Sequence, residues 1–396
     1  MSLARQICAL TGNGLRYIPQ RLGSSLVIMV GIAGVVAVLI PVLAMYTGFR
    51  ATIKGDGQPD RAIVLSREAM TEYESGLSRD AVANIVNVAG ARRDARGEPM
   101  VSAEVVLAAP VSRRRDHSDV NVTLRGVGAQ YFAMRPELKL VAGRLFRPGT
   151  QELLVGVAAR SQFEGLEIGD RVRLQDGDWT VVGAFAGGNG ARESELVTDA
   201  QTVISVYKLD SFNSVAVRLE SAEAFDTLAH ALARDARLLV AVYSEPKYLA
   251  SASDPVNRKL RLVAYGIGSI MGLGALFAAL NSMYSAVASR AAEMATLRAI
   301  GFAAGAVAVA VLAEALFLAL VGAAIGVGLS YAAFHGVTIS TLGGALFDSQ
   351  LVYSLSMTPG MVASVVVFAC VLGLAGALPP AMRAAQANVA DALHET

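Results

Sequence analysis

Cysteine, histidine and lysine are scarce in this chain of 396 residues. The two cysteines, Cys8 and Cys370, both lie outside the charge-rich central block, so no disulfide framework holds that block together. The four histidines are scattered and form no cluster with the spacing of metal ligands. None of the five lysines follows a glycine, which excludes the Gly-Lys-Ser/Thr loop that cradles ATP phosphates. Neither a Gly-x-Ser-x-Gly elbow nor an HExxH motif is present. We therefore expect a non-catalytic chain without cofactor or metal.

Charge is missing from long apolar stretches. Residues 22–49, 262–289 and 349–382 contain no charged side chain, and residues 299–347 contain only Glu314. Each stretch exceeds the roughly 20 apolar residues needed to cross about 30 Å of hydrocarbon. The sequence therefore predicts four membrane spans.

The charges that are present divide the chain into two kinds of region. Residues 49–261 hold 28 of the 34 basic residues and 28 of the 33 acidic ones, so this block is charge-dense and neutral. The six other basic residues share one predicted side of the spans: Arg5, Arg16, Arg21, Arg290, Arg298 and Arg383. Because basic residues mark the cytoplasmic ends of spans, both termini are predicted to be cytoplasmic. The net charge of +1 gives no support for nucleic acid binding.

We expect a membrane protein with four transmembrane α-helices, arranged one plus three. A large α+β extracytoplasmic domain is inserted between the first and the second. In chain order the predicted segments are an amphipathic cytoplasmic segment (1–21), the first span (22–48), the domain (49–255), a stalk with the second span (256–289), a cytoplasmic helix (290–303), the third span (304–334), an outer loop (335–360), the fourth span (361–380) and a cytoplasmic tail (381–396). Pro379-Pro380 is expected to end the fourth span.

Hydrophobic periodicity predicts both strands and helices within the domain. Residues 50–118 and 213–255 each supply strands and a helix, whereas residues 119–212 are mostly strand. We therefore predict two lobes, lobe one from 50–118 plus 213–255 and a β-rich lobe two from 119–212. The apolar run at residues 203–206 is counted among the strands of lobe two.

The stretch Arg290–Phe302 between the second and third spans has the most specific pattern. As a helix it carries an apolar stripe of Met294, Leu297 and Ile300. Charged residues flank the stripe, namely Arg290, Glu293 and Arg298, and Gly301 supplies a stop. Such a helix can lie at the lipid interface or dock into a groove on a partner protein, and the pattern alone favours neither.

Two glycine pairs with four-residue spacing occur within the spans. They are Gly268 with Gly272 in the second span and Gly322 with Gly326 in the third. This spacing lets helix backbones approach closely. Packing within the chain and packing against another subunit are equally compatible with it.

Glu314 is the lone acid within the third span. A carboxylate at that depth costs roughly 2–3 kcal/mol or more unless it faces protein or water. It is either a proton- or substrate-linked site or a group hydrogen-bonded inside the bundle, and the second reading is favoured. Asn281 and Tyr284 are the candidate partners.

The segment SRAAEMATLRAIGF resembles the signature that follows the second span in FtsX-like/MacB-like ABC transporter permeases. The segments LRGVGAQYFAMRPELKLVAGRLF and WTVVGAF look like that family's extracytoplasmic domain. The tail PPAMRAAQANVADALHE is similar to the family's C-terminal pattern, although Asn388-Val389-Ala390 departs from it. The resemblance covers essentially the whole chain.

The resemblance implies a permease-only subunit of the bacterial inner membrane, with its domain periplasmic or extracellular. A second permease copy and a cytoplasmic ABC ATPase, which binds ATP and Mg, would be its partners, together with membrane lipid. The ATPase-docking coupling helix would contain Arg290, Glu293, Met294, Leu297, Arg298, Ile300 and Gly301. ATP hydrolysis would move the outer domain, a process called mechanotransmission.

Such motion would export or extract a lipid, lipoprotein or hydrophobic compound, with or without a periplasmic adaptor. One alternative is an FtsX-like scaffold that regulates an extracytoplasmic hydrolase. Another is a secondary transporter driven by protons at Glu314. The sequence does not identify the substrate.

Overall fold

The computed structural model describes residues 3–17, 22–88, 90–175, 177–187, 190–235, 237–340, 352–355 and 357–386. Its contacts divide the chain into two compact units. The membrane unit comprises residues 1–47, 259–337 and 355–396, and the domain unit comprises residues 48–258 and 338–354. Arg21, much of the predicted outer loop (341–350) and the tail from residue 387 lie outside the described residues.

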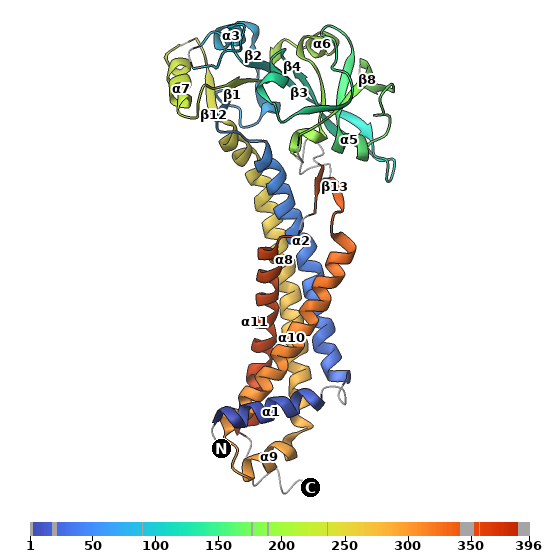
Figure 1. Ribbon diagram of the computed structural model, residues 1–396, viewed down its shortest axis with the longest axis vertical. Coiled ribbons are helices and arrows are strands. Elements are labelled where there is room, and N and C mark those ends of the chain that lie inside the picture. Colours follow the sequence, from blue (N-terminus) through green and yellow to red (C-terminus); the bar gives the residue numbers. More distant parts are fainter. Residues whose placement is uncertain are drawn as a thin grey trace. The chain divides into compact units, whose positions relative to one another are not determined.

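Four of the described helices are long and apolar enough to cross a membrane. They are α2 (Leu22–Asp56), α8 (Glu245–Ala288), α10 (Ala304–Phe334) and α11 (Pro359–Gln386). Two shorter helices, α1 (Leu3–Tyr17) and α9 (Ala291–Ala299), belong to the same unit. Helix α10 packs along α11, and α1 crosses the end of α10 (Figure 1). The predicted frame of one plus three spans is confirmed.

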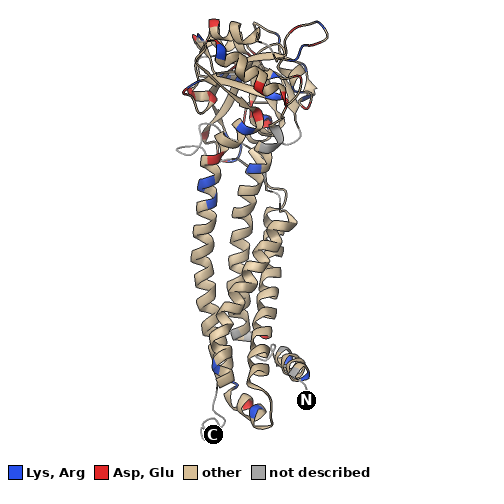
Figure 2. Ribbon diagram, turned by 90° about the vertical axis from the view of Figure 1, so that its left-hand side faces the viewer, with Lys and Arg blue, Asp and Glu red and all other residues tan. Residues whose placement is uncertain are grey.

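Charge is distributed between the units as the sequence predicts. Figure 2 shows acidic and basic residues crowded over the domain unit, while the middle of the helical bundle carries neither. The spanning helices are therefore held by apolar and backbone packing along most of their length.

Two helices are longer than their predicted spans. Helix α2 continues eight residues past residue 48, to Asp56, and α8 begins at Glu245, eleven residues before the predicted stalk. The loss of apolar character marks the end of the hydrocarbon contact, whereas helical hydrogen bonds can continue in water. Pro246 does not oppose the early start, because proline in the first turn of a helix lacks only an N–H that would have no partner within the helix anyway.

Pro379-Pro380 does not end the fourth span, contrary to the prediction. Helix α11 continues to Gln386 with both prolines inside it. Pro380, Ala381 and Ala384 are buried, so packing holds this last part in helical form. Neighbouring helices make prolines tolerable in membrane helices.

The domain unit is built on a ten-stranded sheet with the order β12-β1-β11-β3-β4-β9-β6-β8-β5, in which β7 also pairs with β8. The strands are β1 (Arg61–Ser66), β3 (Val101–Ser112), β4 (Asp119–Val127), β5 (Lys139–Gly143), β6 (Glu152–Gly156), β7 (Arg171–Leu174), β8 (Gly177–Ala186), β9 (Leu196–Asp199), β11 (Ser214–Arg218) and β12 (Val240–Ser244). A separate pair is formed by β2 (Leu77–Ser78) and β10 (Ser211–Phe212). The helices are α3 (Arg79–Val86), α4 (Tyr131–Met134), α5 (Val157–Gln162), α6 (Ala200–Val206) and α7 (Ala224–Arg234), with short 3₁₀ turns η2 (Glu72–Glu74) and η3 (Ala191–Ser194). An α+β domain between the first and second spans is thus confirmed.

The long strand β3 joins the strands of the two predicted lobes. Its first part pairs with β11 at Val101–Glu104, and its second part pairs with β4 at Val105–Ser112. The strands of the two predicted lobes are therefore two halves of one sheet. One hydrophobic core runs under both halves, from Ala62 and Val217 to Leu153 and Trp179.

Local capping decides one element that the sequence reading assigned wrongly. Residues 203–206 belong to α6 rather than to a strand. The Asp199 carboxylate accepts a hydrogen bond from the Thr202 backbone N–H at 2.9 Å, which starts the helix. Ser78 caps α3 in the same way, through the N–H of Ala81.

Part of the predicted outer loop forms a small strand pair in the domain unit. Strands β13 (Thr338–Ser340) and β14 (Val352–Ser354) are antiparallel. The Val352 N–H donates to the Ser194 hydroxyl at 2.8 Å, and the Tyr353 ring meets that of Phe49 edge-on. This segment is thus part of the domain fold.

Candidate functional site

Helix α9 is the short element between the second and third spans. Met294 and Ala295 are buried within the chain, and Leu297 is half-buried. The exposed side consists of Ala292, Glu293, Thr296, Ala299 and Ile300. Their spacing of three to four residues places them on one helical face. Along the predicted stripe, Met294 therefore faces this chain, while Ile300 faces outward and is 70% exposed.

The end of α9 has the form expected of a glycine stop. Gly301 takes a φ of +97°, a conformation in which a side chain would be strained. The Phe302 N–H donates to the Leu297 carbonyl at 3.1 Å, and the Gly301 N–H donates to that of Arg298 at 3.0 Å. These bonds satisfy carbonyls at the helix end and turn the chain toward α10.

The start of α9 is tied to α10 by an ion pair. Arg290 occupies the N-cap position of α9, and its guanidinium Nη1 lies 3.1 Å from the Glu314 carboxylate. Both side chains are 11% exposed, so water screens the pair only weakly. Glu314 therefore pairs with Arg290 rather than with the predicted Asn281 or Tyr284.

Helix α1 covers this ion pair. The Gln6 side chain accepts a hydrogen bond from the Ala303 N–H at 3.1 Å, at the turn between α9 and α10. A Cβ added at Gly14 would lie 3.4 Å from the Glu314 carboxylate oxygen. A small cavity of about 60 Å³ remains between α1, α9 and α10. The amphipathic segment thus helps to hold α9 in place.

The two glycines of α10 face α2 of the same chain. A Cβ at Gly322 would lie 2.8 Å from the Met29 carbonyl oxygen, and one at Gly326 would lie 2.7 Å from that of Ala33. One turn further, the Ser330 hydroxyl donates to the Ala37 carbonyl at 3.3 Å. The three positions form one stripe along which the two backbones meet.

The glycines of α8 also face helices of this chain, with looser contacts. A Cβ at Gly268 would meet the flexible tip of Leu39, and one at Gly272 the ring of Phe368.

Sequence reading missed Gly373 and Gly376 of α11. A Cβ at these positions would lie 2.7 Å from the Cβ atoms of Ala319 and Ala279 respectively. All six glycines contribute to packing inside the membrane unit.

The domain unit contains a buried charge cluster that the sequence reading did not find. Its members expose 8% of their surface or less: Arg61, Glu72, Glu104, Arg125, Arg135, Arg192, Glu195 and Glu245. Arg125 of β4 lies at its centre, within 3.0 Å of Glu72 and 2.8 Å of both Glu104 and Glu195. Four arginines oppose four glutamates, so the buried charge is balanced.

Glu245, the first residue of α8, is the point at which three arginines of this cluster meet. Its carboxylate lies 3.2 Å from Arg135, 3.4 Å from Arg192 and 3.4 Å from Arg61. The Gln58 N–H also donates to it at 3.1 Å. Burial alone would raise the pKa of Glu245, but the arginines hold that pKa below its ordinary value. The ionised carboxylate thus anchors the beginning of α8 in the domain unit.

Nearby aromatic and hydroxyl groups complete the cluster. The Arg135 guanidinium lies 4.6 Å from the centre of the Tyr131 ring, and that of Arg192 lies 5.9 Å from it. The Ser214 hydroxyl donates to Glu72 at 2.6 Å. Burial by itself would raise the pKa of Glu72, but Arg125, Arg192 and Ser214 together lower that pKa to about 2.

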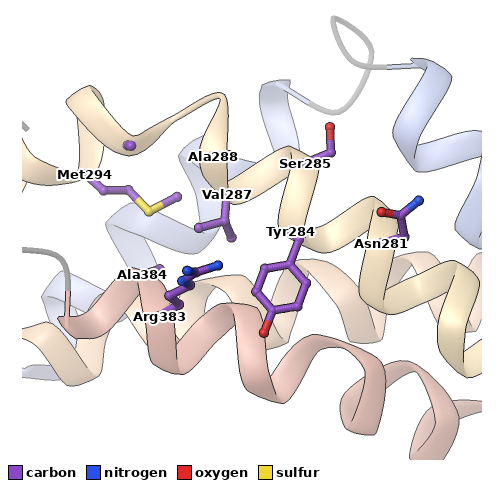
Figure 3. Close-up of a pocket in the computed structure, with 9 residues that line it drawn as sticks. Asn281, Tyr284, Ser285, Val287, Ala288, Met294, Arg383 and Ala384 are labelled. Carbon is purple, nitrogen blue, oxygen red and sulfur yellow. The ribbon is translucent and has the colours of Figure 1, made fainter. Parts of the chain in front are cut away.

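A larger groove lies in the membrane unit between α8, α9 and α11. Its volume is about 540 Å³, and Asn281, Tyr284, Met294 and Arg383 are among its lining residues. Figure 3 shows Tyr284 of α8, Met294 of α9 and Arg383 of α11 directed toward the same space. The Arg383 guanidinium lies 5.8 Å from the centre of the Tyr284 ring.

Comparisons with known proteins identify both parts of the chain. Residues 25–235 match the family model for the MacB-like periplasmic core domain, and residues 265–389 match that for the FtsX-like permease C-terminal region. No curated protein matches the chain.

Two solved structures are among those similar to the domain. The periplasmic region of MacB from Actinobacillus actinomycetemcomitans is 16% identical, with a TM-score of 0.38 over 52% of this chain and 98% of that one. The extracellular domain of the noncanonic ABC-type transporter YknZ from Gram-positive bacteria is also 16% identical, with a TM-score of 0.36 over 46% of this chain and 99% of that one. The matched family models cover the domain and the three spans that follow it, in this order. This chain therefore belongs to the MacB-like and FtsX-like family of ABC transporter permeases.

Proposed function

We propose that this chain couples ATP hydrolysis by a separate cytoplasmic ABC ATPase to movement of its extracytoplasmic domain. The movement serves export or extraction of a lipid, lipoprotein or hydrophobic compound. The observation that carries the proposal is the exposed face of α9, which presents Glu293, Thr296 and Ile300 at the end of two spans. An exposed, largely apolar helix face with one central charge suits a groove on a partner protein.

The orientation in the proposal comes from the basic residues. Arg290, Arg298 and Arg383 lie near the α9 end of the spans, and such residues favour the cytoplasmic side. The ATPase is therefore placed at α9 and the domain on the opposite side, in the bacterial inner membrane.

The contacts at α9 support a path by which docking moves the spans. Arg290 ties the start of α9 to Glu314 of α10, so displacement of α9 pulls on that span. Glycine contacts at 322 and 326 join α10 closely to α2. Close-packed helices move as bodies rather than deform, because their interiors have little free volume.

The buried charge cluster supports the other end of the same path. Glu245 begins α8, the helix that continues into the second span, and three domain arginines hold its carboxylate. A displacement of α8 along its axis is thereby passed to β1, α4 and η3 of the domain. A second copy of the permease would double the four spans around a shared axis.

The proposal is tested by changing the exposed face of α9. We expect Glu293→Lys and Ile300→Asp each to lower co-purification of the ABC ATPase by at least ~10-fold, the loss that follows from removing a contact worth about 1.4 kcal/mol. Glu220→Lys is the matched control, because it reverses an exposed charge in the domain unit. If both α9 variants bind the ATPase as strongly as the wild type, α9 does not have the proposed coupling role.

A second measurement distinguishes transport from regulation. The wild-type complex in proteoliposomes is given ATP together with a fluorescent phospholipid or lipoprotein in the outer leaflet. ATP-dependent extraction supports the proposed function, and Glu314→Gln should reduce it only by loosening α9. Stimulation of a bound hydrolase without extraction would instead identify an FtsX-like regulatory scaffold.

A further inference from the structure

The groove between α8, α9 and α11 contains a cation without a carboxylate partner. Within the described part of the chain, no carboxylate lies within 4.0 Å of the Arg383 guanidinium. The acids of the membrane unit in that part are Glu293 and Glu314, and Glu314 is bound to Arg290. A cation beside a membrane span attracts an anion from outside the chain.

The surroundings of Arg383 leave its hydrogen-bond donors available. The Tyr284 ring attracts the guanidinium through its face, 5.8 Å away, but accepts none of the five N–H bonds in the plane of the group. Asn281, Tyr284 and Ser285 add side-chain amide and hydroxyl donors to the lining of the groove. A planar guanidinium with neighbouring donors matches the oxygens of a phosphate.

The rest of the lining is apolar and leads toward the hydrocarbon. Val287, Ala288, Ala291, Met294 and Ala384 form this wall. Phe277 of α8, one turn before Asn281, is 65% exposed, and Met382 of α11, next to Arg383, is 53% exposed, as is expected of side chains that face lipid. A ligand with a phosphate at one end and a chain of methylenes at the other fits both parts.

The groove is large enough for such a ligand. At a share of about 30 Å³ per water molecule in the liquid, its volume of about 540 Å³ corresponds to roughly 18 water molecules. A single phosphate would fill only a small part of it and leave the apolar wall in contact with water.

We propose that this groove binds one anionic phospholipid from the leaflet at that end of the spans. Its phosphate binds Arg383 with Tyr284 and Asn281, and an acyl chain lies along Val287, Ala288 and Met294. The bound lipid would fill the space between α9 and the ends of α8 and α11. This site is separate from the exposed face of α9 and does not depend on the ATPase.

The test measures lipid binding to the purified full chain in detergent by native mass spectrometry. Phosphatidylglycerol and phosphatidylcholine with the same acyl chains are titrated separately. We expect one phosphatidylglycerol to bind at least ~10-fold more tightly than phosphatidylcholine, as a charge-assisted contact worth about 1.4 kcal/mol predicts. Millimolar inorganic phosphate should not displace it, because phosphate cannot use the apolar wall.

Three variants locate the lipid. Arg383→Gln should weaken phosphatidylglycerol binding by at least ~10-fold, whereas Arg383→Lys should weaken it less, because the charge remains although the planar set of N–H donors is lost. Ala288→Phe fills the apolar wall and should weaken binding without changing any charge. Arg16→Gln is the matched control, since Arg16 is an exposed basic residue of α1 outside the groove.

Three results would overturn the proposal. One is equal loss of binding in Arg383→Gln and Arg16→Gln, which would mean that the lipid responds only to overall charge. The second is equal affinity of the wild-type chain for the two lipids, and the third is unchanged binding in Ala288→Phe. These last measurements decide the matter even if Arg383→Gln does not fold.

Discussion

The two units of this chain bury polar groups in different ways. In the domain unit, the eight charged residues of the buried cluster expose 8% of their surface or less and neutralise one another. In the membrane unit, the backbones of α10 and α2 meet at Gly322 and Gly326, and the Arg290–Glu314 pair lies at the start of α9. The domain unfolds into water, so its stability depends on how completely each buried charge is paired. The spans unfold within lipid, so close packing decides their association.

The largest expected effect comes from removing the centre of the buried charge cluster. Arg125→Met leaves Glu72, Glu104 and Glu195 without their shared partner and should lower the free energy of unfolding by about 3–5 kcal/mol. Urea unfolding of the full chain in detergent measures this. Trp179 is the one tryptophan of the sequence and is fully buried in the domain, so its fluorescence reports the domain alone.

Arg144→Met is the control for that measurement. Arg144 pairs with Glu152, but its side chain is 46% exposed, so the loss should be under about 1 kcal/mol. Equal destabilisation by Arg125→Met and Arg144→Met would show that burial does not determine how much the cluster contributes to the free energy of unfolding.

The second prediction concerns pH. The pKa of Glu72 is about 2 in the folded chain against an ordinary value of 4.5, so its ionisation stabilises the folded state. That contribution is complete above pH 4.5 and should be lost as the pH falls toward 2, by about 3 kcal/mol in total. The measurement is the same urea unfolding, repeated across this pH range.

Glu72→Gln tests whether this carboxylate is the cause. The difference in unfolding free energy between wild type and Glu72→Gln should shrink as the pH falls, because the protonated glutamate resembles glutamine. A difference that stays constant down to pH 2 would contradict the assignment.

The third and smallest effect tests the membrane unit. Gly326→Val places a Cβ about 2.7 Å from the Ala33 carbonyl oxygen, so α10 and α2 must separate. We expect a loss of roughly 1–3 kcal/mol, as for an overpacked core. Unfolding by increasing SDS, followed by circular dichroism, measures it.

Gly328→Val provides the matched control on the same helix. A Cβ at Gly328 would meet no atom within 4 Å, while the change in helix propensity is the same. If Gly326→Val and Gly328→Val unfold at the same SDS concentration, backbone contact between α10 and α2 does not stabilise the bundle. The two units would then not differ in the way that close packing stabilises them.

Sequence reading succeeded where the physical cause is local. The absence of charge located the four spans, and for α10 the predicted and observed bounds coincide at residues 304 and 334. The N-cap of α3 is equally local, because the Ser78 hydroxyl accepts from an N–H three residues away. The cap depends on atoms only a few residues apart, and the spans depend on the transfer of apolar side chains into lipid, so neither needs contacts between distant segments.

Sequence reading failed where distant segments decide. Residues 203–206, by contrast, were assigned wrongly for a local reason, because a short apolar run fits a buried strand as well as a helix and the N-cap at Asp199 was not used. The early start of α8 at Glu245 and the extension of α2 to Asp56 depend on contacts that no periodicity reveals. Glu104 and Arg125, charged residues within strands, were the available signal for the buried cluster, but their partners were not apparent.

The amino-acid sequence by itself determined which segments enter the membrane, because each apolar residue transfers into lipid independently of its neighbours. It also determined the family, through motifs that can be read along the chain. Only the tertiary structure decided that Met294 faces inward, that Glu314 binds Arg290, and that Glu245 meets Arg135, which lies 110 residues away in the chain. An ion pair depends on distance in space, and the fold alone sets that distance.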